Sequence, residues 1–155
     1  MKRLLILVFV ILAWAPKVHA NETKDLTHIY LNLTNKTVCS NRANKCWPVA
    51  LGNKSHPTPN IKGPHYILTK YTNGFNWKNP FTGQVYRKGT HNLGNIWIGI
   101  LTTDKGIEVG FHTTPTPNIP LNKQESLGGC ARMMPKDIQE FATYVNYLDI
   151  IFIVK

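Results

Sequence analysis

A cysteine and a histidine near the end of the sequence are of residue types that can carry nucleophilic chemistry together. Cys130 follows two glycines in the stretch GGCARM, and His112 lies eighteen residues earlier in GFHTTP. A cysteine attacks as its thiolate, and an imidazole within hydrogen-bond reach supplies or stabilises that form. The pair therefore favours acyl transfer. The same residues also fit a structural histidine and a buried thiol, so both interpretations stay open at this point.

The glycines before Cys130 bear on that choice. They indicate a flexible and exposed setting, and Cys130 could be half of a disulfide, a metal ligand, a buried thiol or a nucleophile. They also leave backbone N–H groups free to face a developing oxyanion. A third group must orient the imidazole of a Cys–His pair, and a backbone carbonyl can do so.

The other two cysteines, Cys39 and Cys46, flank the polar, turn-rich stretch SNRANK. If this stretch closes a hairpin, the two lie on facing strands and can form a disulfide in an oxidising compartment. Cys130 is then the odd thiol. Zinc is the alternative for the pair, but it needs about two further ligands. Because the sequence has no CxxC and no HxxxH, we expect a disulfide and no metal.

The first twenty residues predict export. Lys2 and Arg3 precede an apolar run, and Val18 and Ala20 are the small residues of a signal-peptidase site. The run is too short and wrongly flanked for a transmembrane helix, although an uncleaved anchor is the alternative. We therefore expect a signal peptide at residues 1–20 and one domain at residues 21–155.

The sequence is basic, with a formal net charge of +10. Removal of the signal would take away three of these charges, Lys2, Arg3 and Lys17. A basic exported protein suggests an anionic neighbour such as a cell wall or membrane surface. The basic residues are scattered singly rather than clustered, so we expect no nucleic-acid partner.

The elements that must position these residues are mostly strands. Alternating or continuous apolar runs predict strands, and Pro135 with Asp137 near the first turn predicts a single late helix. The strands are expected at residues 28–39, 46–52, 65–72, 96–103, 107–114 and 148–155, and the helix at 135–148. The segment 73–95, dense in glycine, asparagine and aromatics, is expected to be a long loop with a short strand.

Several aromatic and histidine residues receive structural interpretations. Trp47, Trp97 and Tyr66 are expected in the core, and Trp77 in the long loop is expected to fasten that loop rather than line a groove. His91, in the same polar loop, is expected at the surface.

The run GFHTTPTP, followed by ESLGGCARMMPKDIQEF, resembles the YkuD-type L,D-transpeptidase catalytic domain. In that family a strand histidine precedes, by a loop, a cysteine in a Ser-His-Gly-Cys-x-Arg or Asn turn. Upstream, CWPVALGNKSHPTPNIKGPHYI and IWIGI resemble further family segments more weakly. The resemblance implies a mainly β, β-sandwich-like fold with one late α-helix over nearly all of residues 21–155.

Carried over residue by residue, the resemblance implies that Cys130 is the nucleophile and His112 its base. Thr113 matches the residue whose carbonyl orients the imidazole. Gly129 and Cys130 would supply oxyanion N–H donors. Arg132 would bind a substrate carboxylate or brace the turn.

The sequence departs from the family at one place. Leu127 and Gly128 replace the usual Ser-His before Gly-Cys, and Ser126 is one position too early to match. The missing histidine is not the base, but it normally helps to shape the donor pocket and the oxyanion turn. Gly128 keeps its backbone N–H, so the oxyanion site can survive the change.

The resemblance implies a cysteine L,D-transpeptidase of cell-wall biogenesis in the periplasm or wall. It would form an acyl-enzyme with a tetrapeptide stem of peptidoglycan and transfer it to an amine. No cofactor is implied, carbapenems are expected to acylate the protein, and a monomer is expected. The alternatives are a carboxypeptidase that uses water on the same scaffold and a non-catalytic wall-binding module.

Overall fold

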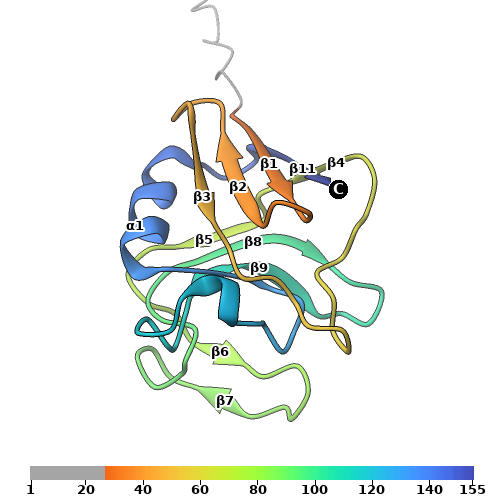
Figure 1. Cartoon of the computed structure of the whole chain (residues 1–155). Helices are drawn as coiled ribbons and strands as arrows, with labels where there is room; N and C mark the ends of the chain where they lie inside the picture. The colour runs from red at the N-terminus through yellow and green to blue at the C-terminus, as the bar shows by residue number, and fades with distance from the viewer. Residues whose placement is uncertain (1–26) are drawn as a thin grey trace, which may run out of the picture.

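The computed structural model describes residues 27–155. The expected signal peptide at residues 1–20 lies outside the described residues. Within residues 27–155, no helix is both long and apolar enough to cross a membrane. The described chain folds mainly into strands with a single α-helix (Figure 1), as the sequence predicts.

The first sheet has five strands in the order β3-β2-β1-β11-β4. Its strands are β1 (His28–Asn32), β2 (Thr37–Ser40), β3 (Lys45–Pro48), β4 (Pro64–Tyr66) and β11 (Ile150–Val154). The N-terminal strand β1 pairs in parallel with the C-terminal strand β11. Both strands alternate buried and more exposed residues, so one face of the sheet supplies the core.

The second sheet has four strands in the order β10-β9-β8-β5, and a separate hairpin joins two short strands. The sheet contains β5 (Thr69–Tyr71), β8 (Trp97–Thr102), β9 (Glu108–Thr113) and β10 (Ala131–Met133); the hairpin contains β6 (Trp77–Lys78) and β7 (Val85–Tyr86). In Figure 1 the hairpin lies below β8 and β9, away from the first sheet.

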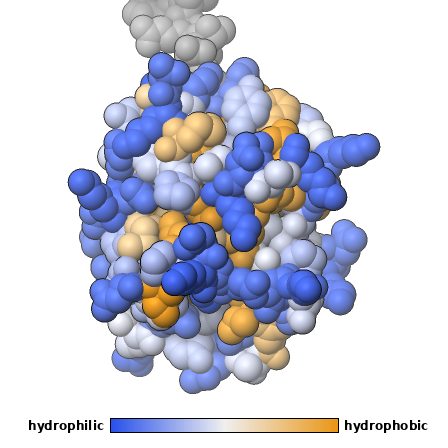
Figure 2. Space-filling view, in the orientation of Figure 1, coloured by the Kyte–Doolittle hydropathy of each residue, from blue (hydrophilic) through white to orange (hydrophobic). Residues whose placement is uncertain are grey.

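The main core joins the two sheets to the helix α1 (Pro135–Tyr144). Phe141 of the helix packs against Phe111 of β9 and Trp47 of β3, with ring centroids 5.2 Å apart in both pairs. Figure 2 shows apolar side chains in the middle of one face, edged by hydrophilic ones.

The sequence prediction of one strand over residues 28–39 is wrong, because a turn divides it into β1 and β2. The Asn32 carboxamide accepts a hydrogen bond from the backbone N–H of Asn35 at 2.7 Å. Lys36 then adopts a φ of 51°. Asparagine competes for local backbone groups in this way and favours turns, so the apolar alternation on either side hides a hairpin.

The predicted strand at residues 65–72 is also divided, because the chain crosses between the two sheets there. The N–H of Ile67 donates to the carbonyl of Asp149, which directly precedes β11 of the first sheet. The N–H of Leu68 donates to the carbonyl of Gly99 in β8 of the second sheet. Ile67 is fully buried at this crossing. Tyr66, which we expected in the core, is 47% exposed.

The helix begins as predicted at Pro135 but ends at Tyr144, four residues before the predicted end. Val145 is extended and fully buried, so it keeps its core position without remaining helical. The side chain of Asp149, which is also fully buried, then accepts the N–H of Asn146 at 2.6 Å. This bond fixes the connection into β11.

A disulfide joins Cys39 and Cys46. The two residues are directly opposite each other in the antiparallel pair β2–β3, which is the facing-strand arrangement that the polar turn between them suggested. Cys130 is the free cysteine of the described chain. One sulfur is therefore available for chemistry.

Candidate active site

The site is built on the face of the second sheet that lies opposite the main core. Strand residues alternate between faces, so His112, Gly110 and Glu108 of β9 share this face while Phe111 and Val109 enter the core.

His112 is central in this face because its two neighbours across the strands also line the site. It is paired with Trp97 on β8 and with Arg132 on β10. The Trp97 and His112 rings are stacked, with centroids 6.2 Å apart and planes inclined by 18°. His112 is 2% exposed, so packing holds the imidazole in its orientation.

A backbone carbonyl selects the tautomer of His112. The Nδ1 atom lies 2.9 Å from the carbonyl oxygen of Thr113. Because a carbonyl oxygen only accepts, Nδ1 must carry the hydrogen and donate it. Nε2 is then left as the acceptor, which is the form that a general base requires.

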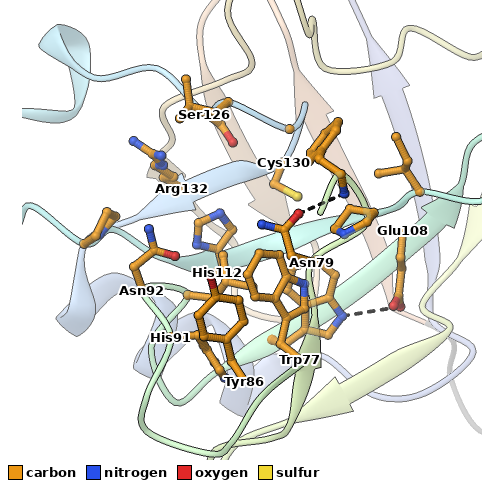
Figure 3. A pocket seen from close by; sticks show the side chains of 18 of the residues that line it. Trp77, Asn79, Tyr86, His91, Asn92, Glu108, His112, Ser126, Cys130 and Arg132 are labelled. Atoms are coloured by element: carbon orange, nitrogen blue, oxygen red, sulfur yellow. Dashed lines mark hydrogen bonds between the residues drawn. The ribbon is translucent and has the colours of Figure 1, made fainter. Parts of the chain in front are cut away.

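Cys130 lies in the same cavity as His112. The cavity has a volume of about 410 Å³, and its wall includes Cys130, His112, Arg132 and Glu108. In Figure 3 the Cys130 sulfur points into the middle of the cavity, between Arg132 on one side and Glu108 on the other.

The expectation that Cys130 is exposed is wrong, because the residue is 8% exposed. It directly precedes β10, whose pairing with β9 carries it against the sheet. Gly99 and Gly110 face each other across β8 and β9, and neighbouring atoms approach both so closely that neither position has room for a Cβ. The glycine turn therefore buries the thiol at the wall of a cavity rather than presenting it to solvent.

Burial keeps both members of the pair neutral at rest. It raises the pKa of the Cys130 thiol to about 11, against a hydrogen bond with the Gly110 backbone that lowers it. Burial also lowers the pKa of His112 to about 4, against the Thr113 hydrogen bond that raises it. The resting pair at neutral pH is thus a thiol beside an uncharged imidazole. Proton transfer must accompany attack on a substrate.

The turn before Cys130 depends on Gly129. Its φ is +80°, and a Cβ there would lie 3.1 Å from the carbonyl oxygen of Pro57. Gly128 has an ordinary φ, and the nearest atoms to its missing Cβ belong to the Phe81 ring, at 3.6 Å. Phe81 thus lies beside the place where family members carry the histidine that this sequence lacks. Leu127, the other replacement, is 69% exposed.

The Gly129→Ala substitution is expected to lower the free energy of unfolding by about 1–3 kcal/mol, because an L-residue is strained at positive φ. Gly128→Ala is the matched control and is expected to stay within about 0.5 kcal/mol of wild type. Denaturant unfolding of both variants measures the difference. Equal stabilities would contradict the described turn.

Arg132 is half-buried beside the pair. Its Nε–H is buried without a hydrogen-bond partner in the described structure, and burial lowers its pKa from the ordinary value. The guanidinium stays charged in proteins nonetheless. Arg132 forms part of the cavity wall, and a guanidinium there is suited to a carboxylate.

For other residues that line the cavity, the sequence-based expectation was missing or differs from the structure. Trp77, Tyr86 and His91 from the long segment all line it, so Trp77 does more than fasten the loop. His91 is half-buried and packs on Phe75, with ring centroids 4.6 Å apart, rather than lying at the surface. Glu108 could have been found from the alternation of β9, since it lies four residues before His112.

Among residues 27–155, no group of three or more His, Cys, Asp or Glu side chains could hold a metal ion. Because Cys130 and His112 lie on the wall of one cavity, the arrangement is suited to nucleophilic attack by sulfur with proton transfer to imidazole.

The family model of the YkuD L,D-transpeptidase catalytic domain matches residues 26–153. The chain therefore belongs to the YkuD L,D-transpeptidase catalytic domain family, as the resemblance around His112 and Cys130 predicts. No curated protein sequence matches the chain significantly.

Solved structures show the same fold at low sequence identity. L,D-transpeptidase 1 of Mycobacterium tuberculosis has a TM-score of 0.56 at 19% identity, covering 84% of this chain and 60% of that chain. A cysteine-to-serine mutant of the Enterococcus faecium L,D-transpeptidase has a TM-score of 0.61 at 22% identity, covering 83% and 50%.

L,D-transpeptidase 3 of Mycobacterium tuberculosis, solved with a faropenem-derived adduct, has a TM-score of 0.54 at 16% identity and covers 84% and 60%. The chain thus spans between half and three fifths of the length of these solved proteins. They share its β-rich fold.

Proposed function

We propose that the protein is a cysteine L,D-transpeptidase that acts on the stem peptides of peptidoglycan. The observation that carries the proposal is the common cavity of Cys130 and His112, with the imidazole tautomer set by the Thr113 carbonyl. Membership of the family supports the reaction class. No metal or cofactor takes part in the proposed steps.

In the first half-reaction the Cys130 sulfur attacks the carbonyl of the third stem residue while Nε2 of His112 takes the thiol proton. The backbone N–H groups of Gly129 and Cys130, with that of Gly128 nearby, stabilise the oxyanion. His112 then protonates the leaving nitrogen, so that D-Ala departs as an amine and a thioester remains on the enzyme.

In the second half-reaction an amine of another stem attacks the thioester. His112 takes a proton from that amine, the carbon–sulfur bond breaks, and the proton returns to the sulfur as the thiol re-forms. The product is an amide cross-link between two third residues. The enzyme returns to its neutral resting pair.

Arg132 is proposed to hold a carboxylate of the donor stem. It is the cationic side chain that lies beside His112 in the cavity (Figure 3), and its Nε–H is buried and unused. A charge-assisted hydrogen bond there would orient the scissile bond over the sulfur.

The protein is proposed to act outside the cytoplasm, in the periplasm or cell wall, as a monomer. The export pattern of residues 1–20, the net charge, which is +10 − 3 = +7 once these residues are removed, and the Cys39–Cys46 disulfide support the proposed location. Disulfides persist in oxidising compartments, and a basic protein is attracted to an anionic wall.

Product analysis tests the proposed function. Purified protein is incubated with a tetrapeptide stem that ends in D-Ala, with and without a second stem as acceptor. The products are identified by mass spectrometry. A cross-linked dimer together with released D-Ala is expected. Released D-Ala with only a trimmed tripeptide would support the carboxypeptidase instead. Binding to isolated wall without D-Ala release would support a wall-binding module.

A further inference from the structure

Glu108 places a carboxylate in the cavity that the proposed acyl transfer does not use. The residue lies on β9, on the same face as His112, and its side chain forms part of the cavity wall. In Figure 3 it lies across the cavity from Arg132, with Cys130 and His112 between the two. The cavity thus has an anionic side and a cationic side.

The carboxylate is held in place by a dedicated set of contacts. Its Oε1 atom accepts hydrogen bonds from the hydroxyl of Thr69 at 2.7 Å and from the indole N–H of Trp97 at 3.3 Å. Gly99 lies beneath this network, and a Cβ there would collide with Glu108 Oε1 and Thr69 Oγ1. The strands are therefore shaped around the carboxylate.

No cation of the described chain neutralises this carboxylate. The two ion pairs described within residues 27–155 are those of Asp149 and Glu140, and the hydrogen bonds of Glu108 in this part of the chain involve Oε1 alone. A second oxygen is therefore left for a ligand.

The charge of Glu108 also works against the nucleophile, because it raises the pKa of the Cys130 thiol while Arg132 lowers it. A neutral glutamine could accept the same two hydrogen bonds. Hydrogen bonding to Trp97 therefore does not explain why residue 108 is a charged glutamate, whereas binding of a positively charged ligand does.

We propose that Glu108 binds the ammonium group of the amine acceptor and so favours aminolysis of the acyl-enzyme over hydrolysis. The inference rests on the proposed transferase function and deepens it. Before attack the bound ammonium loses one proton to solvent, and the resulting amine loses its second proton to His112 as the amide forms. Together with Arg132, the cavity then suits substrates that carry a separated cation and anion.

Partitioning of the acyl-enzyme tests this proposal. The wild type and Glu108→Gln are given the tetrapeptide donor and increasing amounts of one of two acceptors. The first is a stem peptide with a free ammonium group, and the second is hydroxylamine, which is uncharged at neutral pH. D-Ala release reports acylation, and the ratio of transferred to hydrolysed product reports acceptor use. Glu125→Gln removes the same charge from an exposed position outside the cavity and is the matched control.

We expect Glu108→Gln to need about a tenfold or greater concentration of the ammonium acceptor to form equal amounts of transferred and hydrolysed product. The reason is that a charge-assisted hydrogen bond is lost. The partitioning of the acyl-enzyme between hydroxylamine and water, and all values for Glu125→Gln, should stay within about twofold of wild type. D-Ala release by Glu108→Gln should not fall below that of wild type, because the charge that raises the pKa of the Cys130 thiol is removed. Equal losses with both acceptors would show that Glu108 only positions Trp97 and His112, and would overturn the inference.

An unchanged ammonium dependence in Glu108→Gln would also overturn the inference while leaving the transferase function intact. Absence of D-Ala release from the wild type would instead overturn the proposed function, and the role of Glu108 with it.

Discussion

Acylation of Cys130 by faropenem is expected to proceed at a nearly constant rate between about pH 6 and pH 9. The pKa of the thiol is raised to about 11 and that of His112 is lowered to about 4. Thiol and neutral imidazole are therefore the main forms throughout this range, and transfer of the proton during attack needs no prior ionisation. Below about pH 4 His112 becomes protonated, so the base is lost and the rate falls.

His112→Gln tests whether the flat pH profile depends on His112 as the base. Without the base only the ionised thiol reacts, so the rate should rise about tenfold with each pH unit. At neutral pH it should lie on the order of 10²–10⁴-fold below wild type. Stopped-flow or mass measurement of adduct formation gives both profiles. A wild-type rate that climbs as steeply as that of the variant would remove His112 from its role as base.

Cys130→Ser and Cys130→Ala are expected to reduce D-Ala release from a tetrapeptide stem by on the order of 10⁴-fold or more, since the proposed nucleophile is replaced. Serine nearly preserves the volume of the buried side chain, so that variant should remain folded. Release of D-Ala, followed over time with each purified variant, measures the loss.

The control for this experiment is the double substitution of Cys39 and Cys46 by serine. It removes the disulfide and leaves Cys130 in place. Where this variant is folded, D-Ala release should stay within a few-fold of wild type. Release that survives in Cys130→Ser but not in the disulfide variant would place the nucleophile elsewhere.

The fold class could be predicted from the sequence because its strongest signals are local. The apolar run ending in WIGILT and the alternation around His112 predict β8 and β9, and Pro135 predicts the start of the helix. The strand break at Ile67 could not be predicted in the same way, because it depends on the carbonyls of Asp149 and Gly99, which lie far away in the sequence. The break after Asn32 has a local cause, the hydrogen bond between Asn32 and Asn35, but the apolar alternation on either side hides it.

In the candidate site, too, some features could be predicted from local sequence and others could not. The spacing of His112 and Cys130, with the family resemblance, was enough to propose a nucleophile and its base. The burial of Cys130 was not predictable from its glycines, because it arises from the parallel pairing of β10 with β9. The alternation of β9 is enough to place Glu108 on the face of His112, but its contacts with Thr69 and Gly99 form only in the folded sheet and could not be predicted.

Intact mass after incubation with faropenem tests the central claim most directly, because an acyl adduct would remain on the residue that attacked the carbonyl. The account predicts one adduct on the wild type, located by proteolysis and mass spectrometry on the peptide that contains Cys130, and no adduct on Cys130→Ala. A folded wild type without any adduct, or an adduct that persists in Cys130→Ala, would contradict it.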